Sequence, residues 1–150
     1  MADITVEQIE YLSRVNGEPS AEEVERIAGL KAEAARVRAA RPGDEGPGFF
    51  CASLGYWADL NVHDPIEAAA GLAIPILILQ GGRDYQVTTE DFSRFQTGLA
   101  TRRDVQCVLL PRLNHVFMTG EGKSTPVEYD RAGHVDAEVV ERIADFVLAD

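Results

Sequence analysis

The spacing of apolar residues changes along the chain and predicts the order of its elements. Near the N-terminus apolar positions recur every three or four residues, as on the buried face of a helix. The second stretch of this kind carries the stripe Val24, Ile27, Leu30, Ala34 and Val37. We therefore expect two helices, with a capping box that starts at Thr5 in the first and at Ser20 in the second. The loop RPGDEGPG ends this helical region.

The aromatic stretch FFCASLGYWADLNVHDP follows, and its apolar residues have no clear period. It predicts irregular structure with room for one short helical turn. Asp64 can then cap a short helix that starts at Pro65, since Pro is favoured at the first helical position.

Farther along, the apolar spacing indicates strands. The run 74–80 is apolar at every position up to Gln80 and does not alternate, which is typical of a central strand in a parallel sheet covered by helices on both faces. A second strand is expected over 105–110. The order strand, helix, strand, helix predicts a right-handed βαβ unit plus one more helix. The fold class is therefore α/β, in a single domain over 1–150 with a helical region over 1–48.

Two helices belong to this βαβ region. Thr88 is expected to cap the first, whose core stripe is Phe92, Phe95 and Leu99. Asp136 is expected to cap the second. The residues of this last helix that are expected to face inward are Val139, Val140, Ile143, Phe146 and Val147.

Composition excludes several kinds of partner. The chain has 150 residues, enough for one core, and a net charge of −11. Long-range repulsion would oppose encounters with nucleic acids and anionic membranes, so neither is expected as a partner. The start MADITVEQIE lacks the basic and apolar regions of a signal peptide, and the longest apolar run is too short to cross a bilayer. A cytoplasmic location is expected.

The cysteines and isolated histidines indicate no metal site. Cys51 and Cys107 have no metal-ligand spacing and are expected as reduced thiols. His63 and His134 stand apart from other ligand types. We expect neither a metal nor a cofactor.

Asp84 and His115 carry the candidate chemistry. Each directly follows a predicted parallel strand, and in such sheets functional groups lie just past the carboxyl ends of the strands. An acid there can hold an imidazole in one tautomer and stabilise its protonated form. Taken separately, an Asp after two glycines is often a turn former and a lone His a loop residue. Their paired positions favour the catalytic interpretation.

A family resemblance strengthens that interpretation. The motifs IPILILQGGRDYQVT, LNHVFMTGEGKSTPVEY and GHVD resemble the C-terminal part of α/β-hydrolases of the dienelactone-hydrolase and prolyl-oligopeptidase-like group. The resemblance implies a partial α/β-hydrolase fold, with Asp84 as the triad acid and His115 as the triad base. It also implies that the helices up to Ala40 match the lid of such enzymes. In these enzymes the oxyanion loop and the GxSxG elbow lie upstream of everything that matches this chain.

No serine of the chain is a convincing nucleophile. Ser53 in CASLG imitates the elbow, but the stretch before it is predicted as a loop, whereas an elbow needs a strand that feeds a strained turn. We therefore expect the nucleophile to be absent and the isolated chain to be inactive.

Three hypotheses follow. The first is a segment of a serine-type hydrolase that acts on an ester, thioester or peptide-like acyl bond. The second is a degenerate relative that serves as a binding or assembly module. The third, a small independent hydrolase, would use Ser53. Because the apolar strand 74–80 would leave a free edge, we expect a homodimer or a complementary chain that carries the missing strands.

Overall fold

The structure is a computed structural model that describes residues 2–15 and 17–149. The chain divides into two compact units, Met1–Pro65 and Ile66–Asp150. The boundary between these units follows Pro65, and the helical region expected over 1–48 stays a prediction. The single domain expected over the whole chain stays a prediction.

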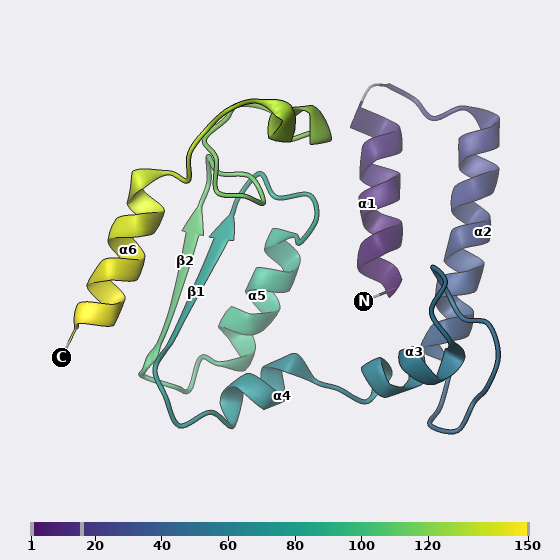
Figure 1. The fold of residues 1–150 in the computed structure, drawn as a ribbon, viewed down its shortest axis with the longest axis horizontal. Coiled ribbons are helices and arrows are strands. Elements are labelled where there is room, and N and C mark those ends of the chain that lie inside the picture. The colour runs from purple at the N-terminus through teal and green to yellow at the C-terminus, as the bar shows by residue number, and fades with distance from the viewer. Residues whose placement is uncertain (1, 16, 150) are drawn as a thin grey trace. The chain divides into compact units, whose positions relative to one another are not determined.

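The first unit is helical. It contains α1 (Ala2–Val15), α2 (Ala21–Arg38) and α3 (Leu54–Asn61), with α1 and α2 side by side (Figure 1). The capping box at Ser20 is confirmed, because its hydroxyl accepts the amide of Glu23 while the Glu23 carboxylate accepts the amide of Ser20. The capping box at Thr5 is wrong, since α1 already begins at Ala2 and a cap must precede the first turn.

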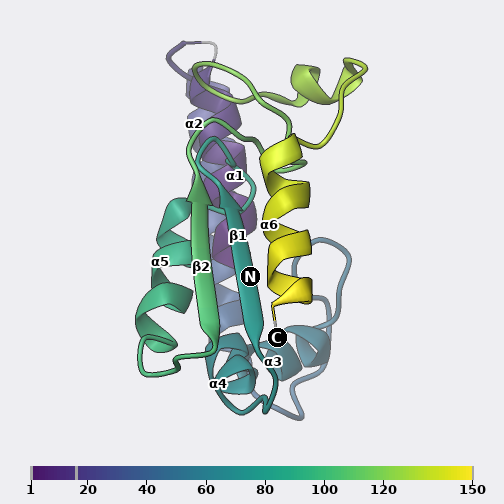
Figure 2. The same ribbon diagram turned by 90° about the vertical axis from the view of Figure 1, so that its left-hand side faces the viewer.

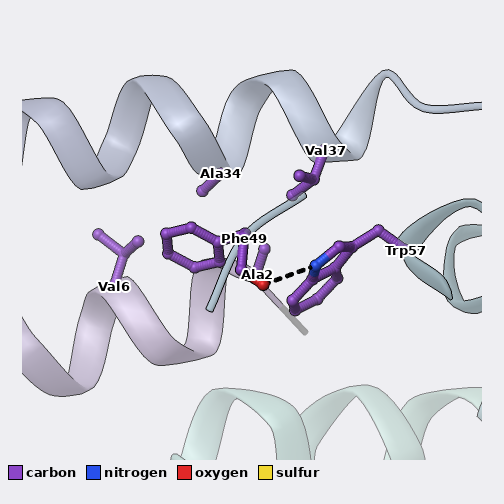
Figure 3. Packing of buried hydrophobic residues seen from close by; sticks show 6 residues of the cluster. All are labelled: Ala2, Val6, Ala34, Val37, Phe49 and Trp57. Atoms are coloured by element: carbon purple, nitrogen blue, oxygen red, sulfur yellow. Dashed lines mark hydrogen bonds between the residues drawn. The ribbon is translucent and has the colours of Figure 1, made fainter. Parts of the chain in front are cut away.

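The core of this unit lies between α1, α2, α3 and the loop before α3 (Figure 3). Its buried members are Ala2, Val6, Ala34, Val37, Phe49 and Trp57. The indole of Trp57 donates a hydrogen bond of 3.0 Å to the carbonyl of Phe49, which satisfies the one polar atom of this aromatic pair. Of the stripe expected on α2, Ile27 is also buried, whereas Val24 is exposed. The aromatic stretch forms α3, a longer helix than the single turn expected there.

The second unit contains α4 (Pro65–Ala70, which begins at the unit boundary), β1 (Ile76–Gly81), α5 (Thr89–Gly98), β2 (Val105–Leu110), the 3₁₀ helix η1 (Pro126–Asp130) and α6 (Ala137–Leu148). The strands β1 and β2 pair in parallel, with Ile76 opposite Val105 and Gly81 opposite Leu110. Helices α5 and α6 lie on opposite sides of this strand pair (Figures 1 and 2). A mixed α/β fold with two parallel strands and flanking helices is thereby confirmed.

The second strand has the predicted bounds, but the first begins two positions late. The carbonyl of Ile74 accepts a hydrogen bond of 2.7 Å from the guanidinium of Arg102, and so lies outside the strand ladder. Arg102 also donates to the carbonyl of Ala69 at 2.8 Å, which ties the end of α4 to the approach of β1. The strand therefore starts at Ile76, where the backbone amide finds the carbonyl of Asp104.

The caps at Thr88 and Asp136 are as predicted and the cap at Asp64 stays a prediction, but the buried face of α6 differs from the one expected. Thr88 forms a capping box with Asp91, and Asp136 accepts the amide of Glu138. On α6 only Val139 is buried and Phe146 is half-buried. The three residues that were wrongly expected to face inward are exposed: Val140, Ile143 and Val147. Two strands are too narrow a sheet to cover the whole apolar face of this helix.

In the part of the chain that the structure describes, each helix is too short or too polar to cross a membrane. The cytoplasmic location stays a prediction.

Candidate active site

The structure brings Asp84 and His115 together at the carboxyl ends of β1 and β2. The imidazole Nδ1 lies 2.9 Å from Oδ2 of Asp84, within the range of a charge-assisted hydrogen bond. The acid side chain is only 7% exposed, whereas the imidazole is 40% exposed. The predicted pairing of these two side chains is therefore confirmed, while their catalytic role stays a prediction.

Backbone and side-chain donors hold the Asp84 carboxylate in place. Its Oδ1 accepts the amides of Gln86 at 2.8 Å and Val87 at 3.0 Å, in a turn that leads into α5. Its Oδ2 is left to face His115, with the amide group of Gln80 at 3.4 Å as a weak second donor. Each oxygen thus has its own task, one to hold the loop and one to hold the imidazole.

Two glycines allow the loops after β1 and β2 to approach closely enough for this pairing. A methyl group at Gly81 would lie 2.6 Å from the carbonyl oxygens of Leu113 and Asn114. At Gly82 it would lie 2.6 Å from Cα of Pro111. Only a residue without Cβ fits such contacts with backbone, so the glycine pair is a requirement of space.

His115 lies in a tight loop that Asn114 organises. The Asn114 side chain is almost wholly buried, and its Oδ1 accepts the amides of Val116 and Met118 at 3.1 and 3.0 Å. Phe117 takes a positive φ of 57°, an uncommon conformation for a residue with a side chain. The loop is thereby closed onto the end of β2, and His115 projects from it toward Asp84.

A second carboxylate, that of Glu128, is bonded to the residues that precede Asp84 and His115. The sequence analysis did not identify it. Glu128 of η1 forms an ion pair with Arg83 and accepts hydrogen bonds of 3.0 Å from Asn114 and from Ser124. Burial raises the pKa of Glu128, but these hydrogen bonds and the positive charge of Arg83 together outweigh it and hold the pKa below its usual value. The partners of Glu128 lie up to 45 residues away in sequence, so no local pattern could have identified this cluster.

Gln80 could have been found from the sequence. It is a polar residue at the end of an apolar strand, and it is buried with its amide donating to the carbonyls of Gly81 at 3.0 Å and Val87 at 2.9 Å. A buried amide that bridges the strand end and the Asp84 turn stiffens the support of the acid.

Ser53 lies in the other unit and serves as the N-cap of α3, where its hydroxyl accepts the amide of Tyr56 at 3.2 Å. A loop with positive φ at Phe50 and Cys51 precedes it, so the strand that a nucleophile elbow requires is not found before Ser53 among the described residues. Cys51 and Cys107 are free thiols. Within the described residues His, Cys, Asp and Glu form no group of three suited to a metal ion.

Comparison with known proteins gives a similarity to an esterase. No family model matches the chain, and no solved structure matches it. The sequence is 45% identical over 93 residues to Esterase EstD of Thermotoga maritima. This match covers 62% of the chain and 23% of that esterase, so the chain spans about a quarter of the length of this relative. The narrower resemblance to the dienelactone-hydrolase and prolyl-oligopeptidase-like group stays a prediction. Over most of its length the chain is similar to part of an esterase.

Proposed function

We propose that this chain carries the acid and the histidine of a serine-type α/β-hydrolase that cleaves ester bonds. The hydrogen bond of 2.9 Å between Asp84 and His115, at the carboxyl ends of two parallel strands, is the observation that carries the proposal. The similarity to an esterase supports the choice of an ester, in preference to a thioester or peptide bond, as the substrate class.

We propose a separate catalytic part for each side chain. With Nδ1–H donated to Asp84, the lone pair of the imidazole is on Nε2, on a ring that is 40% exposed. Nε2 of His115 would take the proton of an attacking hydroxyl and later return it to the leaving alcohol. The Asp84 carboxylate would keep the ring in this tautomer and stabilise the imidazolium while it exists.

The attacking hydroxyl and the oxyanion hole are proposed to come from residues outside the 150 of this chain. Ser53 already caps a helix and lacks the strand–turn–helix context of an elbow. Ser124 is buried with its hydroxyl bonded to Glu128. The chain alone should then turn over activated esters no faster than buffer does.

A chimera with the related esterase tests the proposal. The segment of Esterase EstD that matches this chain would be replaced by the corresponding segment of this chain, extended where needed to include Asp84, His115 and His134. We expect the chimera to hydrolyse p-nitrophenyl acetate. Asp84→Asn should lower kcat by about 10⁴-fold, because an amide favours the wrong tautomer of the imidazole. His115→Gln should abolish turnover above the oxyanion-hole background.

His134→Gln is the matched control, since it removes an imidazole from the same unit that is not hydrogen-bonded to Asp84. The control should retain full activity. A folded, active chimera whose rate is unchanged by Asp84→Asn and by His115→Gln would refute the proposal.

A second candidate function is an assembly module. The exposed apolar side chains of α6 favour it, because contiguous apolar surface on a folded unit marks a site where another protein packs. In that case the chain would bind its partner equally well with Asp84 and His115 both replaced.

A further inference from the structure

The Glu128 carboxylate receives donors from both loops that form the candidate site. Arg83, the residue directly before Asp84, forms an ion pair with its Oε1. Asn114, the residue directly before His115, donates to its Oε2 at 3.0 Å. One half-buried carboxylate is therefore bonded to the sequence neighbour of each member of the pair.

The Arg83 side chain, which forms the first arm of this arrangement, also binds a third segment of the chain. Its guanidinium donates to the carbonyls of Glu121 at 3.1 Å and Gly122 at 3.0 Å, and its side chain is 8% exposed. Gly120 packs so closely against this guanidinium that a methyl group there would collide with it. The long loop between His115 and η1 is thus drawn against the loop that carries Asp84.

The Asn114 arm sets the position of the histidine loop. While its Nδ2 donates to Glu128, its Oδ1 accepts the amides of Val116 and Met118 on either side of the turn. Rotation of this side chain would break all three bonds in a site where it is almost wholly buried, and a buried group left without its partner is destabilising. The orientation of the Asn114 side chain therefore fixes the position of the backbone at His115.

We propose that Glu128 is the positioning residue of this site, which holds the loops of Asp84 and His115 in register through Arg83 and Asn114. The inference rests on the proposed function, because the catalytic role of Asp84 and His115 is itself proposed. The hydrogen bond between these two side chains can nevertheless be measured without any substrate. Glu128 itself does not touch the reacting atoms.

The substitution Glu128→Gln tests whether the hydrogen bonds of Glu128, and not only its volume, position the two loops. The substitution keeps the shape of the side chain but replaces one carboxylate oxygen with an NH₂ group, which is itself a donor. Arg83 donates to one carboxylate oxygen and Asn114 donates to the other. In the variant, one of these two donors must therefore meet the NH₂ group, which cannot accept its hydrogen bond. Either arm that fails releases the loop that it holds.

The readout is the Nδ1 proton of His115, followed by NMR in the full chain labelled with ¹⁵N and assigned by its loss in His115→Gln. We expect exchange of this proton with solvent to become at least about tenfold faster in Glu128→Gln, a factor that corresponds to about 1.4 kcal/mol. Arg83→Lys should act in the same direction, since one ammonium cannot reach both loop carbonyls and Glu128.

Two controls bracket this result. Ser124→Ala removes the third bond to Glu128 but leaves both arms, and should change the exchange rate by less than about twofold. Glu138→Gln removes an acid from the exposed ion pair with Arg142 at 3.1 Å and should change nothing.

Exchange that is unchanged in both Glu128→Gln and Arg83→Lys would overturn the positioning role. Equal acceleration by Ser124→Ala would also overturn it, because the effect would then be general loosening of the loop. Should Glu128→Gln fail to fold, Arg83→Lys decides the matter alone. These outcomes do not depend on ester hydrolysis, so an inactive chimera would count against the proposed function and leave this inference standing.

Discussion

Replacing Gly81 by alanine should separate Asp84 from His115 without altering either side chain. The added methyl group would lie 2.6 Å from the carbonyl oxygens of Leu113 and Asn114, whereas ordinary contact begins at 3.4 Å. The backbone that leads to His115 must therefore retreat by about 0.8 Å, since close-packed backbone does not compress. Gly81 does not have a left-handed φ, so space alone requires a glycine at this position.

The magnitude follows from three contributions. Overpacking against backbone destabilises by about 1–3 kcal/mol. Retreat of Leu113 also stretches its hydrogen bond of 2.9 Å from the amide of Arg83, which contributes about 1 kcal/mol. The lower conformational entropy of alanine in the unfolded chain offsets about 0.4–1 kcal/mol of this. We expect the second unit to lose about 1–3.5 kcal/mol of unfolding free energy.

The assay must report on the second unit. Trp57 lies in the core of the first unit, so its fluorescence follows the wrong transition. Amide signals of β1 and β2, followed by NMR through a urea titration, give the midpoint for the second unit. The Nδ1 proton of His115 is recorded in the same samples and should broaden or vanish.

Gly71→Ala is the matched control in the same unit, because a methyl group there meets its neighbours at an ordinary 3.6 Å. We expect it to change the unfolding free energy by less than about 0.5 kcal/mol. If Gly81→Ala has an equally small effect and leaves the His115 proton unchanged, then the close approach of the two loops does not require glycine at position 81, and the reasoning is wrong.

Three further predictions follow from other contacts. Because the pKa of Glu128 in the folded protein is below its ordinary value of 4.5, the unfolded chain takes up this proton first as the pH falls. The advantage of wild type over Glu128→Gln in urea unfolding should hold above pH 4.5 and shrink below it; a pH-independent difference would contradict this. Ser20→Ala should lower the stability of the first unit by about 1 kcal/mol, measured by Trp57 fluorescence in urea, since it removes a capping box; no change would contradict that role. Finally, the exposed apolar face of α6 leads us to expect a dimer of the 16.4 kDa chain, and sedimentation equilibrium that shows only monomer at micromolar concentration would contradict this.

Interactions between residues close in sequence made much of the fold predictable. The caps at Ser20, Thr88 and Asp136 depend on a side chain and amides two or three residues away, and a sequence shows such pairs directly. The strands and their parallel pairing followed from apolar runs with a helical pattern between them. The capping box predicted at Thr5 was wrong because α1 already begins at Ala2, so Thr5 lies inside the helix and not before its first turn.

The pairing of Asp84 with His115 was predictable for a topological reason. Residues that follow neighbouring parallel strands emerge at the same edge of a sheet, so their order in the sequence was enough to bring them together. The serine hydrolase to which they would belong stays a proposal.

Tertiary structure decided what the sequence could not. The hydrogen bonds of Glu128 join residues up to 45 positions apart in sequence. No local sequence pattern marks Arg83, Asn114 and Glu128 as neighbours. The exposed side of α6 was equally hidden, because helical spacing shows which residues share a face but not whether a sheet is wide enough to cover it. Periodicity and turn chemistry act over a few residues, whereas burial and long-range hydrogen bonds exist only once distant segments have packed.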